Sequence, residues 1–311
     1  MAKYLITGGA GFIGTNLAKK LLAVGHKVVV LDNYSGGNPF DPAQDKKERV
    51  QEGVEYIEGD IRNKEDLDKA CQGVDGIFHM AALPRVVYSV EHPLETHDVN
   101  VNGTLNVLLA ARDNGAKRVI FSSSSSAYGD QEIYPLKEEG VVKKPLAPYA
   151  LHKYIGEHYC RLFAELYGLE TVSLVYFNVY GPYADPDGAY ALVIGKFLKQ
   201  KQNNEPMTIR GDGEMYRDYT HVDDVVNANI LAMTKDTVGK GEVINIGNGN
   251  PYSVNQLAEL IGGPTVTVEA LPGEMKYTKA DNTKAKELLG WEPTIKLEEG
   301  IRMLKEEWGI K

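Results

Sequence analysis

The sequence is poor in cysteine, in net positive charge and in long apolar runs. Cys71 and Cys160 are its only cysteines, which argues against a disulfide framework and fits a reducing cytoplasm. The net charge of -9 over 311 residues argues against electrostatic binding to nucleic acid or to an anionic membrane. We expect no membrane span, because no apolar run approaches the ~18 residues that one needs, and no secretory signal before the first predicted strand.

What is present is an ordinary globular balance, with 43% hydrophobic and 25% charged residues. A chain of this size buries roughly three quarters of its extended surface when it folds, so a large core is available. One large domain or two unequal domains would both fit this length.

The first residues have the pattern of a strand, a glycine turn and a helix. The β-rich run 3–7 is followed by Gly8, Gly11 and Gly14, and residues 16–24 then carry apolar side chains at helical spacing. In such a motif the first glycine allows the tight turn, the second lets the backbone approach a pyrophosphate, and the third lets helix and strand pack closely. The phosphates would lie at the helix N-terminus, where free N–H groups point outward.

A second apolar run, 28–31, ends in Asp32. Glycine-rich turns often only turn the chain, but a carboxylate here is placed to bind the ribose hydroxyls of NAD. It would repel the 2′-phosphate of NADP, and no arginine follows closely enough to compensate, since the next is Arg49. We therefore expect NAD as the cofactor, and no metal.

Strand-like and helical segments alternate along the following part of the chain. Strands are expected at 54–60, 76–82 and 118–122, and helices at 67–71, capped by Asn63, and at 100–114. This alternation predicts an α/β fold with a doubly wound parallel sheet of the Rossmann type. Ligands bind beyond the carboxyl ends of such strands, so one crevice should be lined by Asp32, Asp60, Ala81, Ala82 and residues 122–124.

The alternation weakens after Val179, where prolines and glycines interrupt the chain. We expect a smaller, discontinuous α/β substrate domain formed by 179–220 and 248–311. A predicted helix at 225–233 and a predicted strand at 242–246 would return to the dinucleotide-binding domain, which then comprises 1–178 and about 221–247.

Candidate catalytic residues follow the predicted strand 118–122. Five serines, 122–126, close this strand, and Pro148 opens a helix on which Tyr149 and Lys153 share one face. An ammonium beside a phenol favours the phenolate, so Tyr149 would act as a general base near neutral pH. A serine run can be mere loop polarity and Tyr-x-x-x-Lys alone is a weak motif, but together with the glycine turn they predict catalysis.

The chain resembles, essentially from end to end, the extended short-chain dehydrogenases that act on nucleotide sugars. Beside the glycine turn and the Tyr149–Lys153 pair, the resemblance rests on Asp60-Ile61 and on residues 79–82, 100–104, 176–182, 211–213, 217–219, 222–224 and 288–293. In that family the catalytic hydroxyl lies four residues before the tyrosine of a Tyr-Gly turn, which selects Ser124.

The resemblance implies roles for the candidate residues. The catalytic residues would be Ser124, Tyr149 and Lys153. The cofactor would contact Gly8, Gly11, Phe12, Ile13, Asp32, Asn33, Asp60, Ile61, Ala81, Ala82, Val99, Ser122, Tyr149, Lys153 and Tyr176. The substrate would contact Ser124, Ser125, Ser126, Tyr149, Asn178, Leu192, Arg217 and Thr278. Arg217 could instead form a surface ion pair with Asp218 or Asp224.

The two residues after Ser124 help to separate reactions within the family. Similar 4,6-dehydratases carry Asp-Glu there and similar glucuronate decarboxylases carry a glutamate in the second place, whereas this chain has Ser125 and Ser126. We therefore expect an NAD-dependent UDP-hexose 4-epimerase that works through a transient 4-keto sugar. The alternatives are a glucuronate 4-epimerase, a decarboxylase, a dehydratase or a non-catalytic dinucleotide sensor.

Sugar specificity is expected to depend on Thr278. In the family a residue at this place closes the pocket beside the C2 substituent of the sugar, and a small residue accompanies acceptance of N-acetyl sugars. Threonine therefore predicts turnover of UDP-N-acetylglucosamine as well as UDP-glucose. An offset of one residue would place Tyr277 there instead, on the other face of the chain.

The resemblance also implies a homodimer, formed by the helices near 100–114 and 149–167. Apolar side chains of helical period lie on both helices: Leu105, Leu108, Leu109, Tyr159, Leu162, Phe163 and Leu166. Such stripes can instead be buried within the monomer.

The chain departs from the family pattern at several places. Leu271 and Lys276 stand where arginines are usual, and Glu274 is the acid that follows the first of them. Val175 replaces an arginine, and Pro84 lies where galactose epimerases have a lysine. Since a lysine is a point charge and an arginine is bidentate, these changes bear on diphosphate binding.

Overall fold

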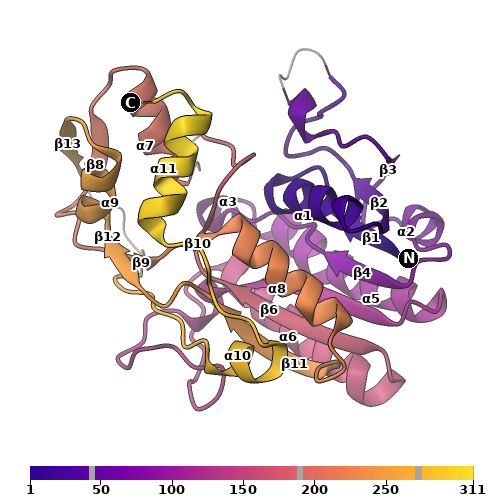
Figure 1. Cartoon of the computed structure of the whole chain (residues 1–311). Coiled ribbons are helices and arrows are strands. Elements are labelled where there is room, and N and C mark those ends of the chain that lie inside the picture. Colours follow the sequence, from indigo (N-terminus) through magenta and orange to yellow (C-terminus); the bar gives the residue numbers. More distant parts are fainter. Residues whose placement is uncertain (42–45, 188–191, 270–274, 311) are drawn as a thin grey trace.

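A computed structural model describes residues 1–41, 46–187, 192–269 and 275–310. A seven-stranded sheet forms its centre, with all pairings parallel and the strand order β11-β6-β5-β4-β1-β2-β3 (Figure 1). The strands are β1 (Lys3–Thr7), β2 (Lys27–Asp32), β3 (Val54–Glu58), β4 (Gly76–His79), β5 (Arg118–Ser124), β6 (Glu170–Tyr176) and β11 (Lys240–Ile246). The predicted doubly wound parallel sheet is therefore confirmed.

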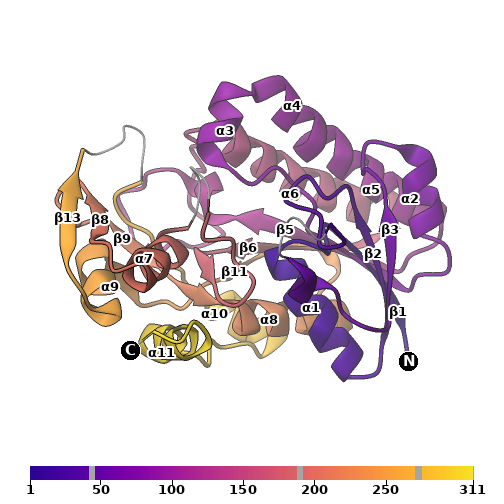
Figure 2. The same ribbon diagram turned by 90° about the horizontal axis from the view of Figure 1, so that it is seen from above.

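Helices cover both faces of this sheet (Figure 2). One face carries α1 (Phe12–Ala23), α8 (Val222–Thr234) and α10 (Thr283–Leu289). The other face carries α2 (Lys64–Ala70), α5 (Gly103–Asp113) and α6 (Pro148–Tyr167), with α3 (Val86–Glu91) and α4 (Pro93–His97) beside α6. Strand side chains alternate between the two cores, so Ile6 and Phe78 lie in one and Leu5 and Ile77 in the other.

The sequence patterns predicted the start of one helix correctly, whereas the ends of other elements differ from the prediction. Asn63 caps α2 as predicted, since its Oδ1 accepts a hydrogen bond from the Glu65 N–H at 2.9 Å. The strand predicted at 76–82 ends at His79, because the next main-chain N–H groups turn to Thr7. The helix predicted at 100–114 is preceded by a π-helical turn at Asp98–Asn102 that leads directly into α5.

The smaller domain has its own core, formed between α7 (Val193–Gln202), α9 (Val254–Ile261) and α11 (Leu297–Glu307). Three short strand pairs accompany these helices: β7 (Val179–Tyr180) with β10 (Thr220–His221), β8 (Met207–Arg210) with β13 (Thr265–Val268), and β9 (Tyr216–Asp218) with β12 (Pro251–Ser253). Figure 1 shows this domain beside the carboxyl ends of the central strands.

The chain returns to the large domain near its end. Ala285, Leu289 and Trp291 pack into the core on the α1 and α8 face, and the Trp291 Nε1–H donates to the Asp224 carbonyl oxygen at 2.9 Å. Part of the segment 248–311 thus packs with the dinucleotide-binding half. The domain boundaries themselves stay a proposal.

Three further observations concern expected absences. Every described helix is too short or too polar to cross a bilayer. Cys71 and Cys160 are both free and buried. Over the described ranges, no cluster of three or more histidine, cysteine or acidic side chains has the arrangement of a metal site.

Candidate active site

Close backbone contacts explain two glycines of the first turn. Gly8 has a φ of +70°, and a Cβ at this position would lie 2.7 Å from the Ala81 Cα. A Cβ on Gly14 would lie 2.6 Å from the Gly8 carbonyl oxygen. Gly11 is the N-cap of α1, whose start has neither a side-chain cap nor an acidic residue in its first turn. The first N–H groups of α1 therefore fit an anionic group such as the diphosphate of a dinucleotide.

Asp32 ends β2 and turns back to the glycine turn. Its Oδ2 accepts from the Ala10 N–H at 3.0 Å and its Oδ1 from the Tyr34 N–H at 2.8 Å. Burial raises the pKa of this carboxyl above its ordinary value. Asp32 links the glycine turn to the segment after β2, where a ribose-binding carboxylate belongs.

Arg49 lies much nearer to Asp32 than their separation in sequence indicates. It is almost fully buried, its Nη2 donates to the Tyr183 carbonyl oxygen at 3.0 Å, and its charge lowers the pKa of Asp32 against the larger effect of burial. The Arg49 guanidinium is directed at Tyr183, so its effect on Asp32 is long-range and weaker than that of burial. The expectation of NAD therefore rests on Asp32 itself.

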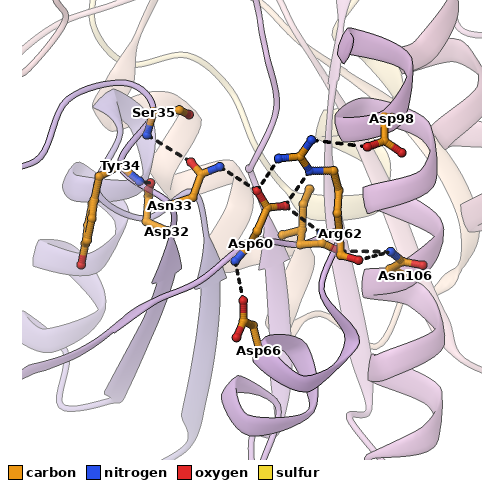
Figure 3. A network of polar contacts seen from close by, with 10 residues as sticks. Asp32, Asn33, Tyr34, Ser35, Asp60, Arg62, Asp66, Asp98 and Asn106 are labelled. Carbon is orange, nitrogen blue, oxygen red and sulfur yellow. Dashed lines mark hydrogen bonds and ion pairs between the residues drawn. The ribbon is translucent and has the colours of Figure 1, made fainter. Parts of the chain in front are cut away.

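Asp60 is the centre of a polar network beyond β3 (Figure 3). Arg62 donates to its two oxygens, from Nε at 3.0 Å and from Nη2 at 2.8 Å, and the Asn33 amide donates at 2.9 Å. The Arg62 hydrogen bonds, more than any other contact, lower the pKa of Asp60 to about 2. Asp66 accepts from the Asp60 N–H at 2.9 Å. Sequence reasoning missed Arg62, although its place two residues after Asp60 was a usable signal.

A buried histidine orders the end of β4. His79 Nδ1 lies 2.8 Å from Thr7 Oγ1, and its Nε2 lies 2.9 Å from Thr104 Oγ1. Burial lowers the pKa of His79 to about 3, so the ring is neutral at neutral pH. The Ala81 N–H donates to Thr7 Oγ1 at 3.3 Å. This network fixes Ala81 against the glycine turn.

The remaining cofactor candidates lie at the start of α1, before α5 and beyond the ends of β3 and β4. Phe12 and Ile13 open α1, Val99 lies in the π-helical turn before α5, and Ala82 follows Ala81 at the end of β4. Ile61 is buried against α5.

Ser124, Tyr149 and Lys153 meet between β5 and α6. Ser124 ends the strand, and its side chain forms a hydrogen bond with Tyr149. Lys153 Nζ lies 5.9 Å from the centre of the Tyr149 ring and donates to the Ser122 carbonyl oxygen at 2.7 Å. The structure thus brings the three predicted catalytic residues together.

Burial has the largest effect on how this group ionises. It raises the pKa of Tyr149, while the hydrogen bond with Ser124 and the charge of Arg85 act in the other direction. It lowers the pKa of Lys153 to about 8. The expected lowering of the Tyr149 pKa by Lys153 is not met, because burial outweighs the opposing effects and the ammonium is directed at a carbonyl oxygen.

Ser122 and Tyr176 also contact each other at the ends of neighbouring strands. Ser122 Oγ lies 3.1 Å from the Tyr176 hydroxyl, which donates to Asn229 Oδ1 at 2.9 Å. Asn229, on α8, was not found from the sequence, because nothing local indicates that a polar residue of this helix reaches β6.

The turn after Ser124 contains hydroxyl groups and no carboxylate. Ser126 Oγ donates to Ser124 Oγ at 2.9 Å, and Ser125 is buried. Both residues that follow Ser124 therefore carry a hydroxyl group and no acid.

Asn178 and Thr278 are joined by a hydrogen bond, although they lie 100 residues apart in sequence. Asn178 Nδ2 donates to the Asp218 carbonyl oxygen at 3.0 Å and to Thr278 Oγ1 at 3.3 Å, and the Asp218 N–H donates to the same Oγ1 at 3.1 Å. Thr278 is fully buried, whereas Tyr277 is half-buried with its ring centre 4.7 Å from that of Tyr134. Of the two residues that could close the pocket beside the C2 substituent (the gate position), Thr278 is the one that contacts Asn178.

The carboxylates of Asp218 and Asp224, the two ion-pair candidates for Arg217, both accept hydrogen bonds from main-chain N–H groups. Arg217 Nη1 donates to the Tyr216 carbonyl oxygen at 3.1 Å. The Asp218 carboxylate accepts from three main-chain N–H groups, and burial raises its pKa to about 6. The Asp224 carboxylate accepts from Thr294 and Ile295.

The other substrate candidate, Leu192, is the N-cap of α7 and lines a small hollow with Tyr183 and Trp308. Among the departures from the family pattern, Val175 is fully buried in β6, while Lys276 and Pro84 are exposed. Leu271 and Glu274 lie outside the described residues.

Comparison with known proteins identifies relatives along the whole chain. A putative UDP-glucose 4-epimerase of Methanocaldococcus jannaschii is 39% identical, over 96% of this chain and 95% of that protein. A UDP-N-acetyl-alpha-D-glucosaminuronate decarboxylase of Bacillus cytotoxicus is 35% identical, over 96% and 95% of the two chains.

Solved structures agree with this result. The UDP-glucose 4-epimerase of Thermotoga maritima, in complex with UDP-glucose, superposes with a TM-score of 0.91 at 38% identity, covering 99% of this chain and 98% of that one. The UDP-N-acetylglucosamine 4-epimerase of Methanobrevibacter ruminantium superposes with a TM-score of 0.90 at 35% identity, with the same coverage.

Residues 4–247 match the model of the NAD-dependent epimerase/dehydratase family. NAD is the cofactor of this family, and the glycine turn, the open start of α1 and Asp32 fit it. The chain belongs to the NAD-dependent epimerase/dehydratase family and is a UDP-sugar enzyme of the epimerase and decarboxylase group.

Proposed function

We propose that this protein is a UDP-hexose 4-epimerase that works through a transient 4-keto sugar. One observation supports this choice above others: Ser126, and not an acidic residue, contacts the Ser124 hydroxyl beside Tyr149 and Lys153. A dehydratase needs an acid to protonate its leaving hydroxyl, and overall identity does not decide the matter, because relatives of similar identity are named for different reactions.

In this proposal Tyr149 is the general base that takes the proton of the sugar 4-hydroxyl, and Ser124 shares that proton. Bound NAD would take up a hydride from C4 and return it to the opposite face of the sugar. Because burial raises the pKa of Tyr149, its phenolate has to be stabilised in the loaded site. The Ser124 hydroxyl, the Arg85 charge and the positive nicotinamide ring all act in that direction. Lys153 holds α6 to β5 and would also contact the nicotinamide ribose.

We assign the diphosphate to the start of α1, the adenosine ribose to Asp32 and Asn33, and the adenine to Asp60 and Ile61. Ala81, Ala82 and Val99 would line the path towards the nicotinamide, with Ser122 and Tyr176 near its ring.

On the substrate side, Asn178 and Arg217 would hold the diphosphate of UDP, with Leu192 nearby. Thr278 would lie beside the C2 substituent, supported by its contact with Asn178. We therefore propose that UDP-N-acetylglucosamine is a substrate as well as UDP-glucose.

We also propose a homodimer formed through α5 and α6. Leu108 and Phe163 are buried in the monomer, and Leu105, Leu109 and Tyr159 pack partly against the same core. Leu162 and Leu166 stay exposed, and Leu151 lies on the same helical face. The proposed interface is thus narrower than the sequence stripes and is centred on this exposed row of α6. A cytoplasmic location stays a prediction from the two free cysteines.

The reaction type can be tested by incubating the purified protein separately with UDP-glucose, UDP-N-acetylglucosamine and UDP-glucuronate. The products are separated by chromatography and weighed by mass spectrometry. A 4-epimerase gives a new peak of unchanged mass. Loss of water would identify a dehydratase, and loss of carbon dioxide from UDP-glucuronate a decarboxylase.

A further inference from the structure

A buried ion pair between Lys143 and Glu157 lies close to the proposed catalytic group, since Glu157 is one helical turn from Lys153 on α6. The side chains of Lys143 and Glu157 are only 5% and 4% exposed, and the Lys143 ammonium contacts the Glu157 carboxylate. Lys143 Nζ also lies 4.8 Å from the Tyr128 ring centre and 5.2 Å from the Tyr154 ring centre. Burying two charges is costly unless each is fully paired, so this pair needs a reason beyond stability.

Glu157 makes a second contact that points to this reason. Its Oε1 accepts a hydrogen bond from Ser123 Oγ at 2.6 Å. Ser123 lies between Ser122 and Ser124 at the end of β5, and it is buried. Because strand side chains alternate, Ser123 faces α6 with Phe121, while Ser122 is directed at Tyr176 of the neighbouring strand.

Three successive residues of β5 are thereby held by one face of α6. Tyr149, Lys153 and Glu157 are spaced by four residues, so they lie one above the other along the helix. Tyr149 bonds to the Ser124 side chain, Lys153 to the Ser122 carbonyl oxygen and Glu157 to the Ser123 side chain. Glu157 lies two turns from Tyr149, the proposed base, and acts on this end of β5 through Ser123.

We propose that Glu157, held in place by Lys143, is a positioning residue that sets where Ser124 lies relative to Tyr149. This inference rests on the proposed 4-epimerase function, because that function assigns Ser124 and Tyr149 their roles. The hydrogen bond to Ser123 fixes the end of β5 along the helix, and Lys143 neutralises the carboxylate and fixes its orientation against two aromatic rings. A displacement of about 1 Å in such a group can lower a rate roughly 100-fold.

The test separates this role from a contribution to stability. Replacing one partner leaves an unpaired buried charge and risks unfolding, so both are replaced together. In the variant Lys143→Met with Glu157→Gln, the glutamine carbonyl oxygen can still accept from Ser123. In the variant Lys143→Met with Glu157→Leu, no acceptor is left. Both pairs are uncharged, and melting temperatures serve as the control for folding.

With UDP-glucose as substrate, we expect the glutamine variant to keep kcat within about threefold of the wild type. The leucine variant should lose kcat by roughly tenfold to 100-fold with little change in KM, since the sugar-nucleotide contacts lie elsewhere. Ser123→Ala should reproduce that loss. Equal kcat values in the two double variants, at equal melting temperature, would overturn the inference.

Crystal structures of both double variants give a readout that does not depend on the reaction. We expect Ser124 Oγ to keep its contact with the Tyr149 hydroxyl in the glutamine variant and to move away from it in the leucine variant. An unmoved Ser124 in both would refute the positioning role even if the protein catalysed a different reaction. Absence of any epimerisation by the wild type would instead refute the proposed function.

Discussion

Lys153 donates a hydrogen bond from its Nζ to the main-chain oxygen of Ser122 at 2.7 Å, and so ties α6 to the strand that ends in Ser124. The ammonium is fully buried, and its pKa is lowered to about 8. A charged group in such a place is kept for what it does and not for stability. Replacing Lys153 therefore tests whether this buried charge serves the proposed active site.

Lys153→Met should make the protein more stable at pH 7, by about 1 to 3 kcal/mol, because it removes a buried charge. The lysine pKa is lower in the folded chain, at about 8, than its ordinary value of 10.5. The buried charge therefore lowers the free energy of unfolding of the wild type by its full amount below pH 8. The stability advantage of the variant should shrink as the pH rises from 8 to 10.5. Urea unfolding across this range measures it, with Lys235→Met, at an exposed position, as control. A variant less stable than the wild type at pH 7 would contradict this reading. Turnover should be lost in Lys153→Met at every pH.

Tyr149→Phe should remove nearly all turnover, by roughly 100-fold to 10,000-fold, because the general base is gone. NAD content should be unchanged, since the glycine turn and the start of α1 are not altered. Tyr167→Phe, at an exposed position of the same helix, is the matched control and should behave as the wild type. Near wild-type rates for the Tyr149 variant would remove this residue from the mechanism.

Asp32→Asn should weaken NAD binding by about tenfold, because an amide has one acceptor oxygen where the carboxylate has two. Both oxygens are already used, by the Ala10 and Tyr34 N–H groups. Extraction of the purified wild type should yield NAD and almost no NADP. Glu55→Gln, at an exposed position of β3, controls for the loss of a charge. A wild type that yields mainly NADP would show that Asp32 does not select the cofactor.

Thr278→Tyr should lose activity on UDP-N-acetylglucosamine selectively and keep part of its activity on UDP-glucose. Because Thr278 is fully buried, the melting temperature must be followed in parallel, and Thr278→Ser, which keeps the hydroxyl, is the control. Tyr277→Ala tests the alternative gate. If the wild type converts only the unacetylated sugars, the gate argument fails while the epimerase proposal stands.

Leu166→Glu should shift the protein from dimer to monomer, because Leu166 is 68% exposed on the proposed contact face of α6. Light scattering at micromolar concentration measures the mass. Val24→Glu, at an exposed position after α1, is the control for an added charge elsewhere. A wild type that is already monomeric would rule out the dimer.

Local patterns were sufficient for the parallel, doubly wound sheet and for the Asn63 cap. With the family resemblance, they also selected the residues of the proposed catalytic group. The same patterns could not show that the charge of Arg49 acts on Asp32, because that effect depends on how residues 46–51 fold. They also gave the wrong direction for the Tyr149 pKa, since sequence shows a neighbouring lysine but not the depth of burial. Glu157 was missed because its partners Ser123 and Lys143 are 34 and 14 residues away in sequence.

The most direct test of the central claim uses UDP-glucose carrying deuterium at C4. A 4-epimerase that removes this atom as a hydride and returns it should give the 4-epimer with all of the label retained at C4. The same reaction in deuterated water with unlabelled substrate should place no deuterium on carbon. Loss of the C4 label to solvent, or a product lighter by water, would contradict 4-epimerisation by hydride return.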